Sequence, residues 1–355
     1  MKILITGNMG YIGSSVVTNL RRVYPDAELI GLDTGYFAHC LTAAKALPET
    51  RIDKQFFCDV RGKIPDEALN GVDSIVHLAA ISNDPMGNRF EQPTIGINGV
   101  ASVELAEKAK KNGVRSFVFA SSCSIYGAVG DAPRKENDPL NPLTTYAKSK
   151  VFVESQLSNI ADKNFIVTCL RFSTACGMSD RLRLDLVLND FVANALATGK
   201  IILLSDGSAW RPLIHVSDMA RAIEWAMNRD GDNGGNFLAV NTGSDEWNYQ
   251  IKDLANSCAD IIGGVTVEMK AGASPDKRSY KVNFDRFHEL APDHQPKVGL
   301  KDAIKDLQTG LTAINFKDPD FRSTWFMRLR VLTSHIETGL LDNDLFWTEK
   351  ARQNR

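Results

Sequence analysis

The chain has 355 residues, of which 43% are hydrophobic and 24% charged, and its formal net charge is -2. This balance is ordinary for a globular protein of one large domain or two joined ones, and the mixed acids and bases include no basic block suited to nucleic acid. Apolar runs are short and the N-terminus does not resemble a signal peptide, so we expect no membrane contact and a cytoplasmic location.

The cysteines and histidines indicate no metal or disulfide chemistry. The six cysteines are scattered without a CxxC pair, and the six histidines have no metal-ligand spacing with them. In a reducing compartment such cysteines are free thiols. We therefore expect no metal site.

Short apolar runs alternate with amphipathic helical patterns through the first half of the chain. Runs that favour strands lie at 3–5, 29–32, 74–78, 117–120 and 166–170, and helical patterns at 102–111 and 144–160. Near-continuous apolarity is typical of strands covered on both faces, and strand–helix alternation predicts a parallel, doubly wound sheet. The expected fold class is therefore α/β of the Rossmann type.

A glycine run follows the first predicted strand and opens the first helix. Glycine at this point permits a tight turn and lets backbone N–H groups approach a pyrophosphate at the helix N-terminus. A plain turn would have a similar composition, but the position between strand and helix favours a dinucleotide site. The residues that we expect to contact the cofactor here are Gly7, Met9, Gly10, Tyr11, Ile12 and Gly13.

Further cofactor contacts are expected where the next strands end. Asp33 ends the second strand, where an acid binds ribose hydroxyls and repels a 2′-phosphate, which favours NAD over NADP; a solvated loop acid is the alternative. Asp59 and Val60 follow the third strand and could meet the adenine, although turn acids are common. Small residues after His77 let the backbone approach the cofactor, and the contacts expected there are Leu78, Ala79 and Ala80.

Tyr146 and Lys150 are spaced i and i+4 in a predicted helix and therefore share one face. A tyrosine that acts as a base near neutrality needs its pKa, normally ~10, to fall by roughly 3 units, and a neighbouring ammonium favours the phenolate. Ser122 ends the fifth strand, where ligands of open α/β sheets bind, and its hydroxyl could join a substrate oxygen to Tyr146. The alternatives are an exposed helix face and a serine-rich turn.

The second half is less regular. Helices are expected near 186–198, 217–228, 249–262 and 300–313, with strands at 201–204 and 237–241. The aromatics of the charged tail beyond 317 indicate that it packs on the body. We assign 1–173 to the cofactor-binding Rossmann domain, to which 213–243 returns, and 174–355 mainly to a substrate-binding region with a helical C-terminal tail.

In this order and spacing, the motifs resemble the extended short-chain dehydrogenase/reductase family of nucleotide-sugar epimerases, dehydratases and reductases. The resemblance implies an NAD-dependent enzyme with Ser122, Tyr146 and Lys150 as catalytic residues, the last two also holding the cofactor. Asn98 matches the family's asparagine near the active site and is included among the cofactor contacts. The implied substrate is a nucleotide-diphosphate sugar, contacted by Asn83, Ser122, Thr174, Asn189, Arg211 and Arg278.

The same resemblance bears on the reaction. Family chemistry begins with hydride transfer from a sugar carbon, commonly C4, as the tyrosine removes the hydroxyl proton. Dehydratases carry Thr-Asp-Glu at the serine motif, whereas Cys123 and Ser124 follow Ser122 here, which disfavours 4,6-dehydration. We expect an NAD-dependent nucleotide-sugar epimerase; the alternatives are a 4-dehydrogenase or reductase on such substrates and a non-catalytic dinucleotide-binding sensor. Cys123 is expected to be a core thiol.

Relatives of this kind form homodimers through a four-helix interface, which implies the same for helices 99–112 and 144–160. Their apolar residues are Val103, Leu105, Ala106, Val151, Phe152 and Leu157. The alternative is that all of them face the protein's own sheet. A two-fold contact suits the first arrangement.

Overall fold

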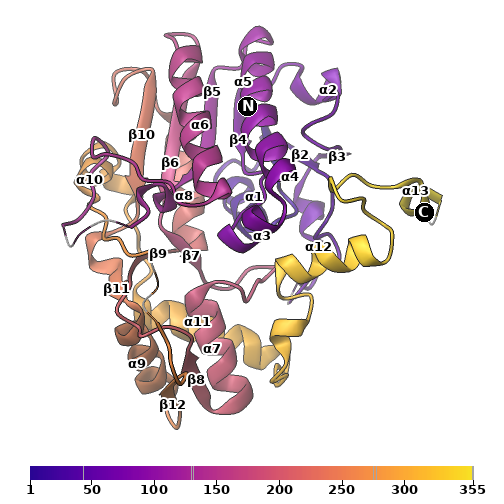
Figure 1. Ribbon diagram of the computed structural model, residues 1–355. Coiled ribbons are helices and arrows are strands. Elements are labelled where there is room, and N and C mark those ends of the chain that lie inside the picture. The colour runs from indigo at the N-terminus through magenta and orange to yellow at the C-terminus, as the bar shows by residue number, and fades with distance from the viewer. Residues whose placement is uncertain (43, 129, 131, 275, 277, 354–355) are drawn as a thin grey trace.

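The computed structural model describes residues 1–355 except 43, 129, 131, 275, 277, 354 and 355. Its centre is a seven-stranded sheet whose paired strands all run parallel (Figure 1). The strands are β1 (Lys2–Thr6), β2 (Glu28–Asp33), β3 (Lys54–Phe57), β4 (Ser74–His77), β5 (Ser116–Ser122), β6 (Ile166–Phe172) and β10 (Phe237–Thr242). Their spatial order, β3-β2-β1-β4-β5-β6-β10, confirms the doubly wound Rossmann-type prediction.

Both faces of this sheet are buried, which explains the unbroken apolar runs of its strands. In β1, Ile3 and Ile5 belong to one core cluster and Leu4 to the other. Successive side chains of a strand point to opposite faces, so each face has its own helical cover. The chain order reverses between β1 and β4, and at such a point ligands of open α/β sheets bind beyond the carboxyl ends of the strands.

Helices cover the two faces as the strand pattern requires. The longer helices are α1 (Tyr11–Val23), α5 (Ala101–Lys111), α6 (Thr145–Ile160), α7 (Val187–Thr198), α8 (Val216–Asn228), α9 (Ile251–Ile262), α11 (Leu300–Ala313) and α12 (Arg328–Glu337). The short ones are α2 (Asp66–Leu69), α3 (Asp84–Arg89), α4 (Glu91–Thr94), the π-helical η2 (Ile95–Val100), α10 (Asp285–Leu290), α13 (Glu349–Gln353) and the 3-10 turns η1 (Pro48–Arg51), η3 (Cys123–Tyr126), η4 (Asp245–Trp247), η5 (Pro292–His294) and η6 (Phe321–Ser323).

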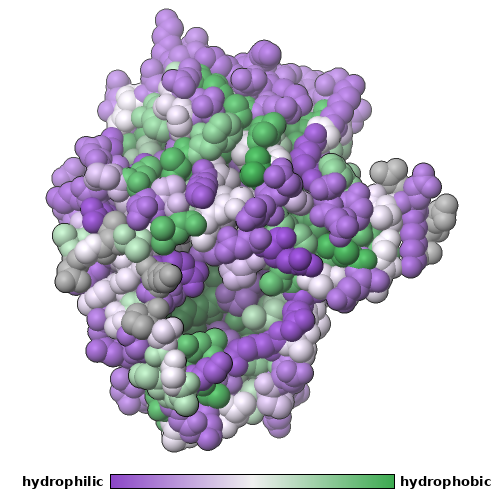
Figure 2. Space-filling model, viewed as in Figure 1, coloured by the Kyte–Doolittle hydropathy of each residue, from purple (hydrophilic) through white to green (hydrophobic). Residues whose placement is uncertain are grey.

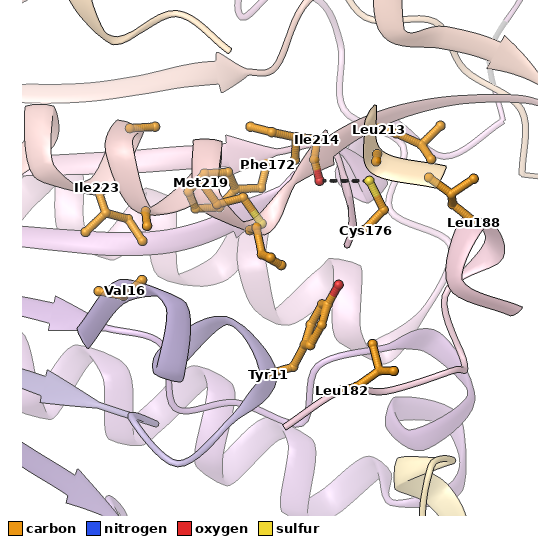
Figure 3. Packing of buried hydrophobic residues seen from close by; sticks show 14 of the residues in the cluster. Tyr11, Val16, Phe172, Cys176, Leu182, Leu188, Leu213, Ile214, Met219 and Ile223 are labelled. Atoms are coloured by element: carbon orange, nitrogen blue, oxygen red, sulfur yellow. Dashed lines mark hydrogen bonds between the residues drawn. The ribbon is translucent and has the colours of Figure 1, made fainter. Parts of the chain in front are cut away.

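On one face α1 packs against α8, and on the other α5 packs against α6. Figure 3 shows part of the first contact, where Val16 of α1 lies opposite Ile223 of α8 and Tyr11 points toward Cys176. None of the helices in the described part of the chain has the length and apolarity of a membrane span.

The second half of the chain adds a smaller lobe at the carboxyl edge of the sheet (Figure 1). It contains a three-stranded sheet of β7 (Thr174–Cys176), β9 (Trp210–His215) and β11 (Asn248–Gln250), and a pair of β8 (Lys200–Leu203) and β12 (Thr266–Met269). Val17 of α1, Phe191 of α7 and Leu307 of α11 share one hydrophobic core. This core includes side chains from both sides of residue 173, so it does not mark a boundary there. The division into two domains at residue 173 stays a prediction.

The C-terminal tail packs on the body, as its aromatic content predicted. Phe321 and Phe326 are buried, whereas Phe346 keeps 44% of its surface exposed. Leu341 and Leu345 join the core under the sheet's second face. Figure 1 shows this yellow segment running from the smaller lobe to the side of the molecule where β2 and β3 lie.

Candidate functional site

A cavity of about 850 Å³ opens where the carboxyl edge of the sheet meets the smaller lobe. Figure 2 shows a hollow between the two lobes, with hydrophilic side chains along its rim. Its size and mixed lining are those of a cofactor or ligand site. The sequence-predicted residues that line it are Gly7, Gly10, Tyr11, Ile12, Gly13, Asp33, Asp59, Val60, Leu78, Ala79, Ala80, Asn83, Ser122, Tyr146, Lys150, Thr174, Arg211 and Arg278.

The glycine turn is shaped by close packing against the end of β4. Gly7 has a φ of +73°, and a Cβ there would lie 2.7 Å from the backbone nitrogen of Ala79, so a side chain cannot be accommodated. Helix α1 begins after Gly10, and among the described residues no side chain caps it. Its first N–H groups are therefore available at the cavity, which suits a pyrophosphate.

Asp33 connects the glycine turn to the loop after β2. Its carboxylate accepts hydrogen bonds from the backbone nitrogens of Met9 (3.0 Å) and Gly35 (2.8 Å), while burial raises its pKa. Each carboxylate oxygen can accept a second bond, so capacity remains for ribose hydroxyls. Met9 thus takes part through its backbone nitrogen, which donates to Asp33, while its side chain is buried behind the cavity wall.

Tyr146, Lys150 and Ser122 meet at the centre of the cavity. Thr144 caps α6 by accepting from the nitrogen of Ala147, which places Tyr146 in the first turn. The Lys150 ammonium donates to the carbonyl oxygen of Ala120 (2.7 Å) and lies 5.5 Å from the centre of the Tyr146 ring. Ser122, at the end of β5, hydrogen-bonds to the Tyr146 phenol.

Burial shifts the pKa values of this pair in opposite directions. It raises the pKa of Tyr146 to about 12, against the opposing effects of the Ser122 hydrogen bond and the Arg183 charge. It lowers the pKa of Lys150 to about 7. Desolvation therefore outweighs the Arg183 charge at Tyr146, and the lowered pKa expected from the spacing of Tyr146 and Lys150 stays a prediction.

Asn98 and Asn189, two of the predicted ligand contacts, lie behind the cavity wall and hydrogen-bond to other parts of the protein. The Asn98 amide accepts from the nitrogen of Ile81 (2.8 Å) and donates to its carbonyl oxygen (2.9 Å), which fixes the segment after β4. The Asn189 amide accepts from the nitrogen of Gly177 and donates to the Tyr11 hydroxyl. Both side chains are buried, so they position the wall rather than face a ligand.

Two arginines from the smaller lobe reach the cavity as the sequence predicted. Arg211 and Arg278 both pair with Asp276, at 2.9 and 3.0 Å, and Arg278 also pairs with Asp84 at 2.8 Å. The second pair joins the smaller lobe to the start of α3. The two guanidinium groups are balanced by these two carboxylates, and their planar forks suit a diphosphate.

The sequence reasoning missed an ion pair close to Tyr146. Arg183 binds Asp185 (2.5 Å) and donates to the Ser82 hydroxyl (2.8 Å), and Asp185 also accepts from the Asn83 amide (3.0 Å). The alternation of charged and apolar residues at 181–185 was the available signal. A pair this deep in a cavity wall can orient a polar ligand.

Ser124 stands at a position where dehydratases of the family carry a carboxylic acid, and no other role was predicted for it. Ser124 belongs to the cavity lining, and its buried hydroxyl oxygen has no hydrogen-bond partner within the described part of the chain. A buried unpaired hydroxyl is costly unless a ligand or water completes it. Ser124 is therefore a candidate ligand contact.

Cys123 and His77 have structural environments, which for Cys123 was the expectation. The Cys123 thiol is buried and donates to the carbonyl oxygen of Arg171, and burial raises its pKa. The His77 ring lies between the hydroxyls of Thr6 (2.7 Å) and Ser102 (2.8 Å), and burial lowers its pKa to about 3. Neither side chain is poised for proton transfer at neutral pH.

Comparison with known proteins identifies the family. Residues 3–242 match the NAD dependent epimerase/dehydratase family. UDP-glucose 4-epimerase of Pasteurella multocida is 30% identical over 72% of this chain and 81% of its own length, and dTDP-glucose 4,6-dehydratase of Streptomyces griseus is 27% identical over 91% and 95%.

Solved structures show the same fold. MoeE5 in complex with UDP-glucuronic acid and NAD has a TM-score of 0.74 at 23% identity, covering 88% of this chain and 99% of MoeE5. UDP-glucuronic acid 4-epimerase of Bacillus cereus, in complex with UDP-glucuronic acid and NAD, has a TM-score of 0.73 at 22% identity, covering 88% and 100%. With its family motifs at the carboxyl edge of a Rossmann-type sheet, the chain belongs to the NAD-dependent epimerase/dehydratase family, whose members are NAD-dependent enzymes acting on nucleotide sugars.

Proposed function

We propose that this chain is an NAD-dependent nucleotide-sugar epimerase that inverts a sugar carbon, C4 in the first instance, by transient oxidation. The observation that carries the proposal is the convergence of Ser122, Tyr146 and Lys150 in one cavity that also receives the glycine turn and two arginines. Relatives at 30% identity that carry the name UDP-glucose 4-epimerase support this reaction and UDP as the nucleotide.

Each residue has a distinct part in the proposed reaction. Tyr146 takes the proton of the sugar hydroxyl and returns it, Ser122 holds the sugar oxygen against the phenol, and Lys150 anchors the ribose beside them. NAD, when bound, accepts and returns the hydride and brings a positively charged nicotinamide ring. Because the pKa of Tyr146 is raised to about 12, chiefly by burial, the phenolate form needs positive charge beyond that of the protein's own side chains.

The residues after Ser122 separate this proposal from dehydration. Elimination of water needs an acid and a base beside the sugar, and these positions hold Cys123, whose thiol is buried, and the hydroxyl of Ser124. Neither is a carboxylic acid. An epimerase needs only the proton-transfer group, the cofactor and room for the keto-sugar to turn over.

The proposed substrate contacts divide the cavity into two ends. Arg211 and Arg278 would bind the diphosphate, and Asn83, Thr174 and Ser124 would contact the sugar or its neighbours. Asp33, Asp59 and Val60 would hold the adenosine of NAD at the opposite end. Tyr146 would then lie between the two ligands.

The test is turnover by the purified chain on a panel of UDP- and dTDP-sugars, with products separated chromatographically and absorbance followed at the wavelength of NADH. An epimeric product without net NADH supports the proposal. Stoichiometric formation of NADH identifies a 4-dehydrogenase and stoichiometric consumption of NADH a reductase, and a protein that binds NAD but yields no product is a dinucleotide sensor.

Assembly belongs to the same proposal. Leu105, Ala106 and Leu157 face the protein's own core, but Phe152 keeps 46% of its surface exposed and lies over Gly99. Ile95 and Val100 of η2, which packs on α6, are also exposed. These three side chains form an apolar face suited to a two-fold homodimer, narrower than the interface expected from the sequence.

A further inference from the structure

Part of the cavity wall comes from a segment far beyond the family match, which ends at residue 242. Residues 321–348, here called the C-terminal segment, supply Arg322, Met327 and Arg328 to the lining. The match to the Bacillus cereus epimerase covers all of that protein but only 88% of this chain, so this chain has residues with no counterpart there.

The C-terminal segment holds the loop that follows β2. The Trp347 indole donates to the carbonyl oxygen of Thr34 (2.7 Å), and the Tyr36 hydroxyl donates to the carbonyl oxygen of Leu345. The rings of Tyr36 and Trp347 lie 5.7 Å apart. Thr34 and Tyr36 themselves line the cavity next to Asp33. The segment thus fixes the loop at the adenosine end.

It also holds the turn that follows β3. Arg61 binds Asp59 (2.7 Å) and donates to the carbonyl oxygen of Asp344 (2.6 Å), while the Phe346 ring covers its guanidinium at 3.6 Å. Phe346 is partly exposed, so this contact forms the outer cover of the site. Both loops proposed to bind adenosine are therefore connected to one C-terminal element.

Arg328 adds a charge to the same wall. Its side chain is 2% exposed and donates to the carbonyl oxygens of Arg181 (2.7 Å), Leu182 (3.1 Å) and Trp325 (3.1 Å). It forms no ion pair with any residue that the structure describes. A buried cation without a carboxylate is unfavourable unless an anion completes it, and the uncapped start of α1 opens into the same cavity.

We propose that the C-terminal segment retains NAD: it fixes both adenosine loops and presents Arg328 as a counter-charge for the dinucleotide pyrophosphate, so that NAD leaves slowly. The inference rests on the proposed assignment of this cavity to NAD and is independent of the sugar reaction. Retention serves an epimerase in particular, because the hydride taken from a sugar must be returned to that sugar before the cofactor can leave.

The experiment measures the dissociation rate of NADH, without any sugar, by mixing NADH-loaded protein with excess NAD and following the fluorescence. Arg328→Met removes the charge, and Trp347→Phe keeps a ring but loses the bond to Thr34. Their controls are Arg330→Met, an exposed arginine two positions along α12, and Lys350→Ala, whose ammonium contacts only the carbonyl oxygen of Thr338 among the described residues. Arg328→Met should speed release at least roughly tenfold, Trp347→Phe roughly threefold or more, and the controls less than about twofold.

Thermal unfolding of the ligand-free variants separates retention from a structural role. If Arg328→Met and Trp347→Phe lower the melting temperature but release NADH at the wild-type rate, the segment only supports the fold and the proposal is overturned. Should Arg328→Met fail to fold, Trp347→Phe decides alone. Fast release from the variants together with no epimerase activity in the wild type would refute the proposed function and leave retention standing. A wild-type chain that does not bind NADH overturns both.

Discussion

The ammonium of Lys150 lies 5.5 Å from the ring centre of Tyr146, one turn along the same face of α6, and it is tethered to the carbonyl oxygen of Ala120. Burial lowers the pKa of Lys150 to about 7 and raises that of Tyr146 to about 12, so at neutral pH the phenol is neutral and the lysine is near the midpoint of its titration. Desolvation is the largest cause of both shifts, and perturbed pKa values of this kind are common at functional sites.

Lys150→Met should stabilise the ligand-free protein. The fall of the lysine pKa from 10.5 to about 7 is worth on the order of 4 kcal/mol, a cost that is absent above the unfolded pKa, grows as the pH falls, and is complete below the folded pKa. The variant also loses the hydrogen bond to Ala120, which costs about 1 kcal/mol of stability. The net gain in the free energy of unfolding is therefore ~1–3 kcal/mol at pH 7. Thermal unfolding should show this gain shrinking toward pH 10.

The control for that experiment is Lys148→Met, an exposed lysine on the same helix, which should change stability by less than about 0.5 kcal/mol. A destabilised Lys150→Met at pH 7, or a difference that does not depend on pH, would contradict a buried lysine with a lowered pKa.

Asp33→Ala should reduce the preference for NAD over NADP. The carboxylate repels a 2′-phosphate, but it also accepts from the nitrogens of Met9 and Gly35, so both dinucleotides should bind more weakly while the ratio of their Kd values falls toward one. Because burial raises the pKa of Asp33, the wild-type ratio should also fall on acidification. Titration with both dinucleotides measures this, and wild-type binding of NADP as tight as that of NAD would refute it.

Arg211→Met should weaken substrate binding more than it slows the chemical step. The guanidinium is proposed to hold the diphosphate, and its removal leaves Asp276 still paired with Arg278. We expect KM for the nucleotide sugar to rise roughly tenfold or more with kcat little changed. Steady-state kinetics measures this, with Lys281→Met as the control. The Lys281 ammonium lies over the Trp210 ring, and neither residue lines the cavity. A change in kcat alone would place Arg211 elsewhere in the reaction.

Phe152→Glu should convert a homodimer into a monomer. The change introduces two like charges across a two-fold axis at a side chain that is 46% exposed. Light scattering at micromolar concentration measures the mass, with Lys148→Glu as the control on the same helix. A monomeric wild type would reject the proposed interface.

The regular elements and the centre of the site were predictable because they depend on local pattern. Strand runs near 3–5 and 166–170 became β1 and β6, and the Ser122–Tyr146–Lys150 group converges because parallel strands end at one edge. The effect of burial on the pKa of Tyr146 was not predictable, since spacing reveals a neighbouring lysine but not the desolvation of the phenol.

The remaining parts of the site depend on packing between distant segments. Arg183 and Arg328 reach the cavity from the smaller lobe and the tail, and the alternation at 181–185 does not reveal which wall Arg183 joins. The surroundings of Asn98 and Asn189 were not predictable either, because the fold buries their amides against backbone and hydroxyl groups of distant segments.

The most direct test of the account is the turnover of Tyr146→Phe on the nucleotide sugar that the wild type epimerises. The variant loses one oxygen and keeps the ring, so its melting temperature and NAD affinity should stay close to those of the wild type. The account predicts that turnover falls by ~10²–10⁴, the effect of losing a positioned acid/base. Turnover within a factor of ~3 of the wild type, in a variant that binds NAD normally, would contradict it, because Tyr146 would then be one more surface residue of α6.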